Sequence, residues 1–133
     1  LLGEFEVFGT FCPTYSLTST TASSPVFAGD SAIVTLANTD VADLPAGTYT
    51  VTYNLSAPNL ATGLTSTMVV TTAGSGSSGT FVTENLANDG ATTITVTNLA
   101  LDGACSNTIS ASNFANITVN PCAAGNTAPL FNN

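Results

Sequence analysis

The sequence contains no lysine, no arginine and no histidine, and its eight charged side chains are all acidic. Phosphate backbones are bound mainly through lysine and arginine, so this composition argues against nucleic-acid binding. The net charge of −8 also disfavours contact with an anionic membrane surface. No side-chain salt bridge and no lysine–asparagine isopeptide crosslink can form within the chain, and trypsin-like proteases find no cleavage site.

The same absences argue against an enzyme. Without histidine, lysine or arginine, a nucleophile lacks its usual base, and an oxyanion or phosphate lacks a stabilising cation. Two carboxylates can act as acid and base, but Glu4 and Glu6 are expected on the wet face of a strand, and Asp40 and Asp43 in a loop. We therefore expect no catalytic residue and assign these carboxylates to solubility.

The chain also lacks a long apolar run, a basic leader segment and an initiating methionine. A helix that spans a bilayer needs about 18 to 20 consecutive apolar residues, so no membrane insertion is expected. We interpret the chain as a mature or excised segment with the length of a single domain.

Cysteine is scarce, with only Cys12, Cys105 and Cys122 in the chain. No C-x-x-C pair occurs, and without histidine the cysteines match no metal-binding motif. Three cysteines allow one bridge, in three possible pairings. Because the first and last strands of a sandwich can be neighbours, we favour a disulfide between Cys12 and Cys122. The alternatives are three free, buried thiols or a bond from Cys105 to another molecule.

Threonine alternating with aliphatic or aromatic residues is abundant, as in "GTYTVTYNL" at residues 47–55 and "TTITVTNL" at residues 92–99. Alternation with period two is typical of strands, and β-branched residues favour a pleated sheet. Threonine then forms the wet face of the sheet, as in antiparallel sheets with one solvated side. No convincing helical period occurs, so we expect an all-β fold.

Strands separated by turn signals every 8 to 15 residues or so are typical of a β-sandwich. We divide the chain into an N-terminal apolar strand at 1–12, a sandwich at 13–121 and a tail or linker at 122–133. The expected strands are residues 1–11, 14–20, 31–37, 48–55, 64–72, 79–86, 92–99 and 107–119, the last as two short strands or as one strand with a bulge at 112–113. The expected core residues are Phe5, Val7, Phe11, Leu36, Tyr49, Val51, Tyr53, Val69, Phe81, Ile94, Val96, Ile109, Phe114, Ile117 and Val119.

The ordered series GTYTVTY, ATGLT, TTAG, TTITVTN and CSNTIS resembles the tandem repeats of very large surface adhesins of Bacteroidota, including gliding-motility adhesins exported by the type IX secretion system. The resemblance covers about residues 13–121. It implies an immunoglobulin-like antiparallel β-sandwich of about seven or eight strands, a location at the bacterial cell surface, and a structural or adhesive role. Two features depart from the repeats, namely the extra apolar strand at 1–11 and a C-terminus that does not continue into another repeat.

The same resemblance points to a modification site. Asp30-Ser31-Ala32 resembles the short Asp-Ser/Thr-apolar motif of O-glycosylation in Bacteroidota, so Ser31 is the expected sugar-bearing residue.

Two acidic loops are candidate calcium sites, because Ca²⁺ is bound by six to eight carboxylate, amide and carbonyl oxygens. The first, "ANTDVAD", supplies Asp40 and Asp43, and the second, "ENLANDG", supplies Glu84 and Asp89. Neither loop fits an EF-hand, and the alternative is that both are turns held by their own Asn and Asp side chains. Apart from this possible Ca²⁺, no cofactor is expected.

The segment "LLGEFEVFGTF" suggests a role in assembly. It places Leu1, Phe5, Val7 and Phe11 on one face, opposite two glutamates. The simpler interpretation makes it the first strand of its own sandwich. Alternatively it is a donor strand that adds to an open sheet edge of a neighbouring subunit, and head-to-tail addition that does not close produces a filament.

These observations lead us to expect an extracellular structural or adhesive module that acts through strand pairing. It would be either a surface-adhesin repeat or the subunit of a self-assembling fibre, with adjacent repeats or copies of itself as partners. The alternative is a binding module that depends on Ca²⁺ or carbohydrate, with surface glycans as partners.

Overall fold

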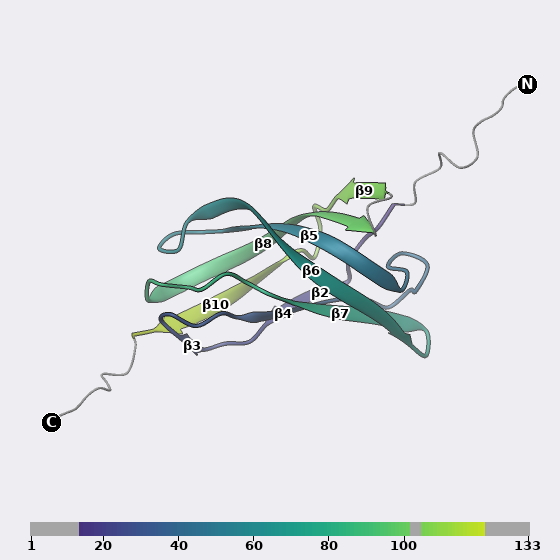
Figure 1. Ribbon diagram of the computed structural model, residues 1–133. Coiled ribbons are helices and arrows are strands. Elements are labelled where there is room, and N and C mark those ends of the chain that lie inside the picture. The colour runs from purple at the N-terminus through teal and green to yellow at the C-terminus, as the bar shows by residue number, and fades with distance from the viewer. Residues whose placement is uncertain (1–13, 102–104, 122–133) are drawn as a thin grey trace, which may run out of the picture.

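The computed structural model describes residues 14–101 and 105–121, and within them every regular element is a strand (Figure 1). No helix in this part of the chain could cross a membrane. The all-β expectation is therefore confirmed. The strands are β2 (Ser19–Ala22), β3 (Val26–Phe27), β4 (Ile33–Asn38), β5 (Gly47–Leu55), β6 (Ala61–Ala73), β7 (Gly76–Val82), β8 (Gly90–Leu101), β9 (Cys105–Thr108) and β10 (Phe114–Asn120).

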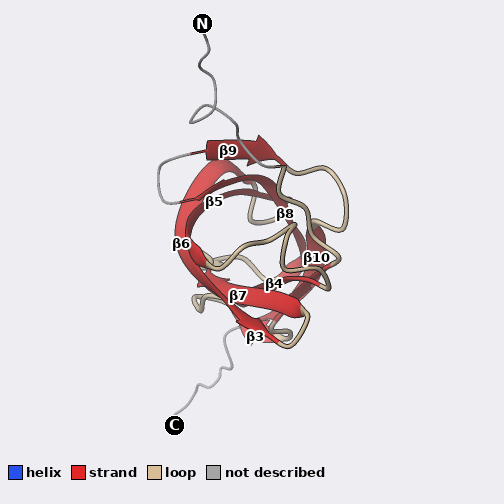
Figure 2. Ribbon diagram, turned by 90° about the vertical axis from the view of Figure 1, so that its right-hand side faces the viewer, coloured by secondary structure: helices blue, strands red, loops and turns tan. Residues whose placement is uncertain are grey.

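The strands form one curled, mixed sheet in the order β2-β4-β7-β6-β5-β8-β10-β3, with β9 paired to β8 (Figure 2). All neighbouring strands are antiparallel except β3 and β10, which are parallel. The sequence led us to expect two separate antiparallel sheets. The ladder is continuous instead, because the long strand β6 pairs with β5 from Ala61 to Val70 and with β7 from Val69 to Ala73.

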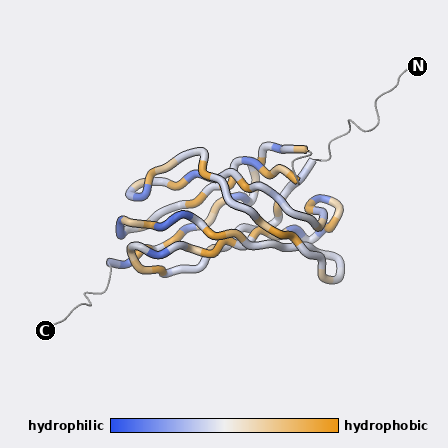
Figure 3. Tube along the Cα trace, in the orientation of Figure 1, coloured by the Kyte–Doolittle hydropathy of each residue, from blue (hydrophilic) through white to orange (hydrophobic). Residues whose placement is uncertain are grey.

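Strand β5 shows how the alternating sequence creates the core. Tyr49, Val51, Tyr53 and Leu55 are all buried, and Thr48 and Thr50 between them are exposed. Figure 3 shows orange hydrophobic stretches separated by paler positions along the chain. The predicted dry and wet faces of this strand are therefore confirmed. Leu36, Phe81, Ile94, Val96, Ile109, Ile117 and Val119 are also buried as expected.

Two predicted core residues point to solvent. Val69 is 58 % exposed and Phe114 is 57 % exposed. In β6 the pairing of Tyr49 with Met68 places Met68 and Val70 inside, which turns Val69 outward. In β10 the inward residues are Ile117 and Val119, and Phe114 has the opposite parity. Three other predicted core residues, at positions 5, 7 and 11, lie outside the described residues.

This register predicts a sharp contrast between two adjacent valines. Val69→Thr should change the free energy of unfolding by less than about 0.5 kcal/mol, because a surface hydroxyl remains hydrated. Val70→Thr has nearly the same shape but buries a hydroxyl, so it should cost about 1–3 kcal/mol. Urea unfolding of both variants measures the difference, and equal losses would contradict the register.

Several strand boundaries differ from expectation. Residues 107–119 form two strands, β9 and β10, rather than one bulged strand. Residues 76–78, which lie between two expected strands, belong to β7, where Gly79 lies so close to β6 that a Cβ would come within 2.6 Å of the Val69 carbonyl oxygen. Gly74, with φ of +64°, makes the turn itself. The two-residue strand β3 was expected to be a turn.

The chain enters and leaves the sheet at opposite ends, which we call the N-terminal pole and the C-terminal pole (Figure 1). The N-terminal pole comprises residues 14–16 and the loop 39–46, joined by a hydrogen bond from Ser16 N to Asp43 O of 3.0 Å. The C-terminal pole comprises loops 28–32, 56–60 and 83–89, with Ala28 N bonded to Asn120 O at 2.8 Å. The predicted segments 1–12 and 122–133 lie outside the described residues.

Candidate functional site

The described carboxylates all lie in loops, and no described strand carries a charged residue. Asp40 and Asp43, two of the predicted calcium ligands, lie in the loop at the N-terminal pole. Glu84 and Asp89, the other two, lie in a loop at the C-terminal pole. The two candidate calcium loops therefore lie at opposite poles, and in the described part of the chain no three acidic, cysteine or histidine side chains gather as a metal site.

The loop at the N-terminal pole is organised by hydrogen bonds of its own. Asp40 Oδ1 accepts a bond from Ala42 N at 2.9 Å, and its carbonyl accepts one from Asp43 N at 3.1 Å. Buried Asn38 accepts from Asp40 N at 2.8 Å and donates to Ser16 O at 2.8 Å. This is the arrangement of an Asx-type turn, the alternative that the sequence left open.

Ser31, the predicted glycosylation site, precedes β4 at the C-terminal pole. It is half-buried, and its Oγ donates a hydrogen bond to Asn85 Oδ1 at 2.9 Å. A glycan on this oxygen would replace the donated hydrogen, so the bond to Asn85 would be lost. Glycosylation of Ser31 stays a prediction.

The cysteines and the donor strand fall mostly outside the described residues. Cys105 begins β9, where it is half-buried and disulfide-bonded. Cys12 and Cys122, the predicted pair, lie outside this part, so their bond stays a prediction. Three cysteines allow only one bridge within the chain, so a bridge from Cys105 to Cys12 or Cys122 would exclude the predicted pair. Leu1, Phe5, Val7 and Phe11, the predicted donor residues, also lie outside.

The C-terminal pole is held by an asparagine pair that the sequence did not single out. Buried Asn59 donates through Nδ2 to Asn88 O and Thr92 Oγ1, both at 2.8 Å, and accepts from Asn88 N at 2.9 Å. Asn88 Nδ2 in turn donates to Pro58 O at 2.9 Å. These neutral amides connect two loops whose bonded residues are 29 positions apart in the sequence. In the sequence, Asn59 lies between two expected strands and Asn88 lies in the second candidate calcium loop.

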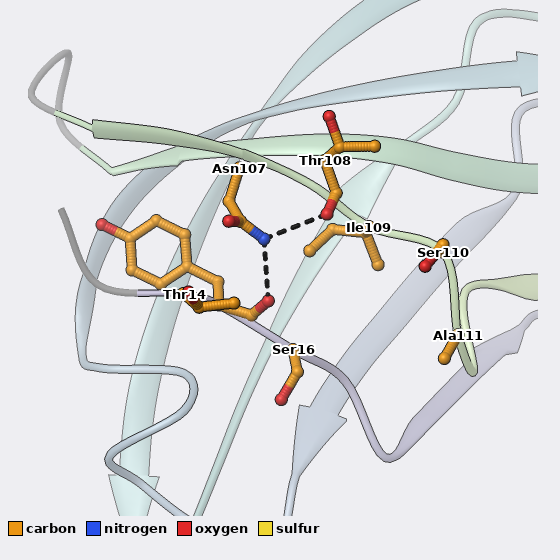
Figure 4. Close-up of a pocket in the computed structure, with 8 residues that line it drawn as sticks. Thr14, Ser16, Asn107, Thr108, Ile109, Ser110 and Ala111 are labelled. Carbon is orange, nitrogen blue, oxygen red and sulfur yellow. Dashed lines mark hydrogen bonds between the residues drawn. The ribbon is translucent and has the colours of Figure 1, made fainter.

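A small pocket of about 190 Å³ lies at the N-terminal pole (Figure 4). Asn107 spans it, donating through Nδ2 to Tyr15 O and Thr108 O, both at 3.0 Å. The other lining residues are uncharged, so the pocket offers neither a base nor a cation. The lining residues are Thr14, Tyr15, Ser16, Asn107, Thr108, Ile109, Ser110 and Ala111.

The three tyrosines are buried in the core, and one of them, Tyr15, also lines the pocket. Burial raises the pKa of Tyr49 to about 12, with a further contribution from Tyr15, whose ring packs edge-on at 5.5 Å. Burial also raises the pKa of Tyr15 and of Tyr53. Each phenol thus stays protonated near neutral pH, and Tyr49 donates its hydrogen to Pro45 O at 2.6 Å.

The outer face of the sheet is an uncharged surface rich in threonine. One cross-strand row runs through Thr21, Thr35, Thr80, Val69 and Thr48 on β2, β4, β7, β6 and β5. The aliphatic side chains Ile33 and Val82 form a directly opposed pair beside this row, and both are about half exposed.

No protein-family model matches the sequence, and no curated protein matches it.

Proposed function

We propose that this protein is an extracellular structural and adhesive module, either a repeat of a bacterial surface adhesin or the subunit of a fibre. The observation that carries the proposal is the position of the two poles. The described chain enters at one end of the domain and leaves at the other, so that copies joined in series extend in line instead of folding back on one another.

An immunoglobulin-like sandwich is the finer fold that we propose. The strand order supports it when the curled sheet is divided at β6 into a layer with β2, β4 and β7 and a layer with β5, β8 and β10. Tyr53 of the second layer packs on Phe81 of the first, with ring centroids 5.4 Å apart, and Glu84 N donates to the Tyr53 hydroxyl at 2.9 Å. Core contacts of this kind join two layers in a sandwich.

The chemistry of the surface also supports a mechanical role. The chain has no cationic side chain, and the described carboxylates are in loops. The three tyrosines are buried, and burial raises the pKa of each. Acid–base and electrostatic catalysis need the opposite arrangement, with titratable groups gathered in a cleft. We therefore propose that the protein is not an enzyme. The resemblance to surface adhesins of Bacteroidota supports export to the cell surface, with adjacent repeats or copies as partners.

A groove of about 380 Å³ at the C-terminal pole favours a carbohydrate-binding module as the second candidate. Hydroxyl and amide side chains line it, and the 74 % exposed Leu60 forms an apolar wall. The polar lining residues are Asn54, Ser56, Thr62, Thr93 and Thr95. Calorimetry with a glycan panel, with and without Ca²⁺, tests this candidate, and no heat of binding would exclude it.

Removal of residues 1–11 tests the proposed function. If the protein is a fibre subunit, the full chain should form long assemblies that the truncated chain does not, because the donor strand is gone. If it is a repeat, both chains should be monomers. Size exclusion and electron microscopy distinguish these results, with circular dichroism to show that the truncated chain keeps its strands. Compact closed oligomers of both chains would contradict an arrangement in series.

A further inference from the structure

The first half of β6 is an uncovered sheet edge. Residues 61–68 pair with β5 on one side only, and β7 begins to pair with β6 at Val69. On the other side Ser66 Oγ donates a hydrogen bond of 3.0 Å to Val82 O, and within the edge Gly63 N is already bonded to Asn54 Oδ1 of β5 at 2.9 Å. Alternate backbone groups before Ser66 therefore face outward, as at any strand edge. We propose that this edge, residues 61–66, is the site to which residues 1–11 of a second copy add as an antiparallel strand.

The other open edges are less available. At the C-terminal pole, β10 is covered by β3 and by a bond of 2.9 Å from Thr118 N to Ser24 Oγ. Between β2 and β10, Thr20 Oγ1 donates to Ser112 O at 2.6 Å. The outer side of β9 is bridged to Tyr15 by Asn107. Unlike these edges, the first half of β6 has no described strand on its outer side at the C-terminal pole.

The direction and reach of the donor segment fit this edge. At least 13 residues precede Thr14 at the N-terminal pole, which is about 43 Å of extended chain. When a second copy follows in line, its N-terminal pole faces the C-terminal pole of the first copy, where β6 begins. The donor chain then runs toward its own Thr14, and so toward the start of β6. Strand β6 runs away from its start, so the two strands are antiparallel. Antiparallel pairing needs no crossover connection.

The side-chain pattern of the two strands also fits. On β6, Leu64 is half-buried against the core, whereas Thr65 and Thr67 are exposed. If residues 1–11 are extended, their sequence places Leu1, Phe5, Val7 and Phe11 on one face and two glutamates on the other. A strand added beside β6 places its apolar face level with Leu64 and its glutamates in water. Residues 61–68 contain neither charge nor proline, two of the devices that block such pairing. The register with β5 shifts between Leu64 and Ala61, where Gly63 has a φ of +69°, so the regular part of the edge begins at Leu64.

This inference depends on the fibre form of the proposed function, and hydrogen exchange on the full chain tests it. Exchange is compared below and above the concentration at which the chain assembles. Strand addition should slow those amides of residues 61–66 that face away from β5, because their N–H groups become bonded on assembly, whereas Gly63 N is already bonded to Asn54 Oδ1. Assembly without added protection at these residues would overturn the inference and leave the fibre function intact. Failure to assemble at any concentration would overturn the fibre function itself.

A matched pair of variants sharpens the test. Thr65→Asp places a charge on the open edge, beside the donor glutamates, and should raise the concentration for half-assembly by about tenfold or more. Thr80→Asp adds the same charge to an exposed threonine of β7 that is paired on both sides, with Thr35 and with Val69. It should assemble like the unmodified chain. Equal effects of the two variants would contradict the assignment of the edge.

Discussion

Replacing Asn59 by alanine should lower the free energy of unfolding by about 3 kcal/mol, because three hydrogen bonds are lost in a buried place. Asn59 is only 9 % exposed and bonds to Asn88 O, Asn88 N and Thr92 Oγ1. The alanine leaves these groups without a partner, and a buried polar group without a partner costs more than the hydrogen bond itself gained. Urea unfolding monitored by circular dichroism measures the loss.

The matched control for this variant is Asn116→Ala. Asn116 is exposed and accepts one bond of 2.9 Å from Thr93 Oγ1, so its loss should cost less than about 1 kcal/mol. Asn59→Asp is informative as well, because it keeps the shape but removes two donated bonds and buries a carboxylate in a chain without any cation. It should destabilise at least as much as the alanine. If Asn59→Ala cost no more than Asn116→Ala, the amide pair would not hold the loops.

The faces of the strands were predictable where a single alternation runs through the strand. In β5 four consecutive inward positions carry large apolar residues, and no other assignment of the faces is possible. The run Met68-Val69-Val70 in β6 has no such alternation, so only the pairing with β5 decides which residue points inward. Phe114 shows a different error. Its parity conflicts with that of Ile117 and Val119, the buried residues of the same strand.

The sheet order and the site could not be read from the sequence in the same way. Local alternation says which face is dry but not which strand is the neighbour, and β6 joins β5 to β7 in one sheet because its two halves pair with different strands. The separation of Asp40 from Glu84, and the contact of Asn59 with Asn88, follow from that order. Residues far apart in sequence carry no local signal of contact, so the pairing of Asn59 with Asn88 was not predicted, and each acidic loop was considered as a separate calcium site.

Raising the pH should destabilise the protein abruptly in the alkaline range, after little change around neutrality. Of the side chains that ordinarily titrate between about pH 6 and 9, cysteine is the only one present. Tyr49 has its pKa raised to about 12 by burial and by Tyr15, against an ordinary value of 10.0. The folded state therefore favours the neutral phenol more than the unfolded state does. The stability that this provides is complete below about pH 10 and is lost as the pH rises through about 12.

The size of the loss follows from linkage. Two pKa units correspond to about 3 kcal/mol, and the raised pKa values of Tyr15 and Tyr53 act in the same direction. Urea unfolding at a series of pH values, combined with tyrosinate absorbance, measures both the loss and the ionisation. Alkaline unfolding that began well below the ordinary tyrosine pKa would contradict this account, because no tyrosine would then have been protected.

Tyr49→Phe separates the ionisation of this phenol from its packing. At neutral pH the variant loses only the bond of 2.6 Å to Pro45 O, so it should be less stable by about 1 kcal/mol. As the pH rises past about 10, the unmodified protein loses stability through Tyr49 and the variant does not, so the two curves should converge. Curves that stayed parallel to the alkaline limit would mean that Tyr49 does not ionise on unfolding in this range, and that another group causes the transition. Because this chain has no lysine or arginine, those other candidates are Tyr15, Tyr53 and any cysteine thiol.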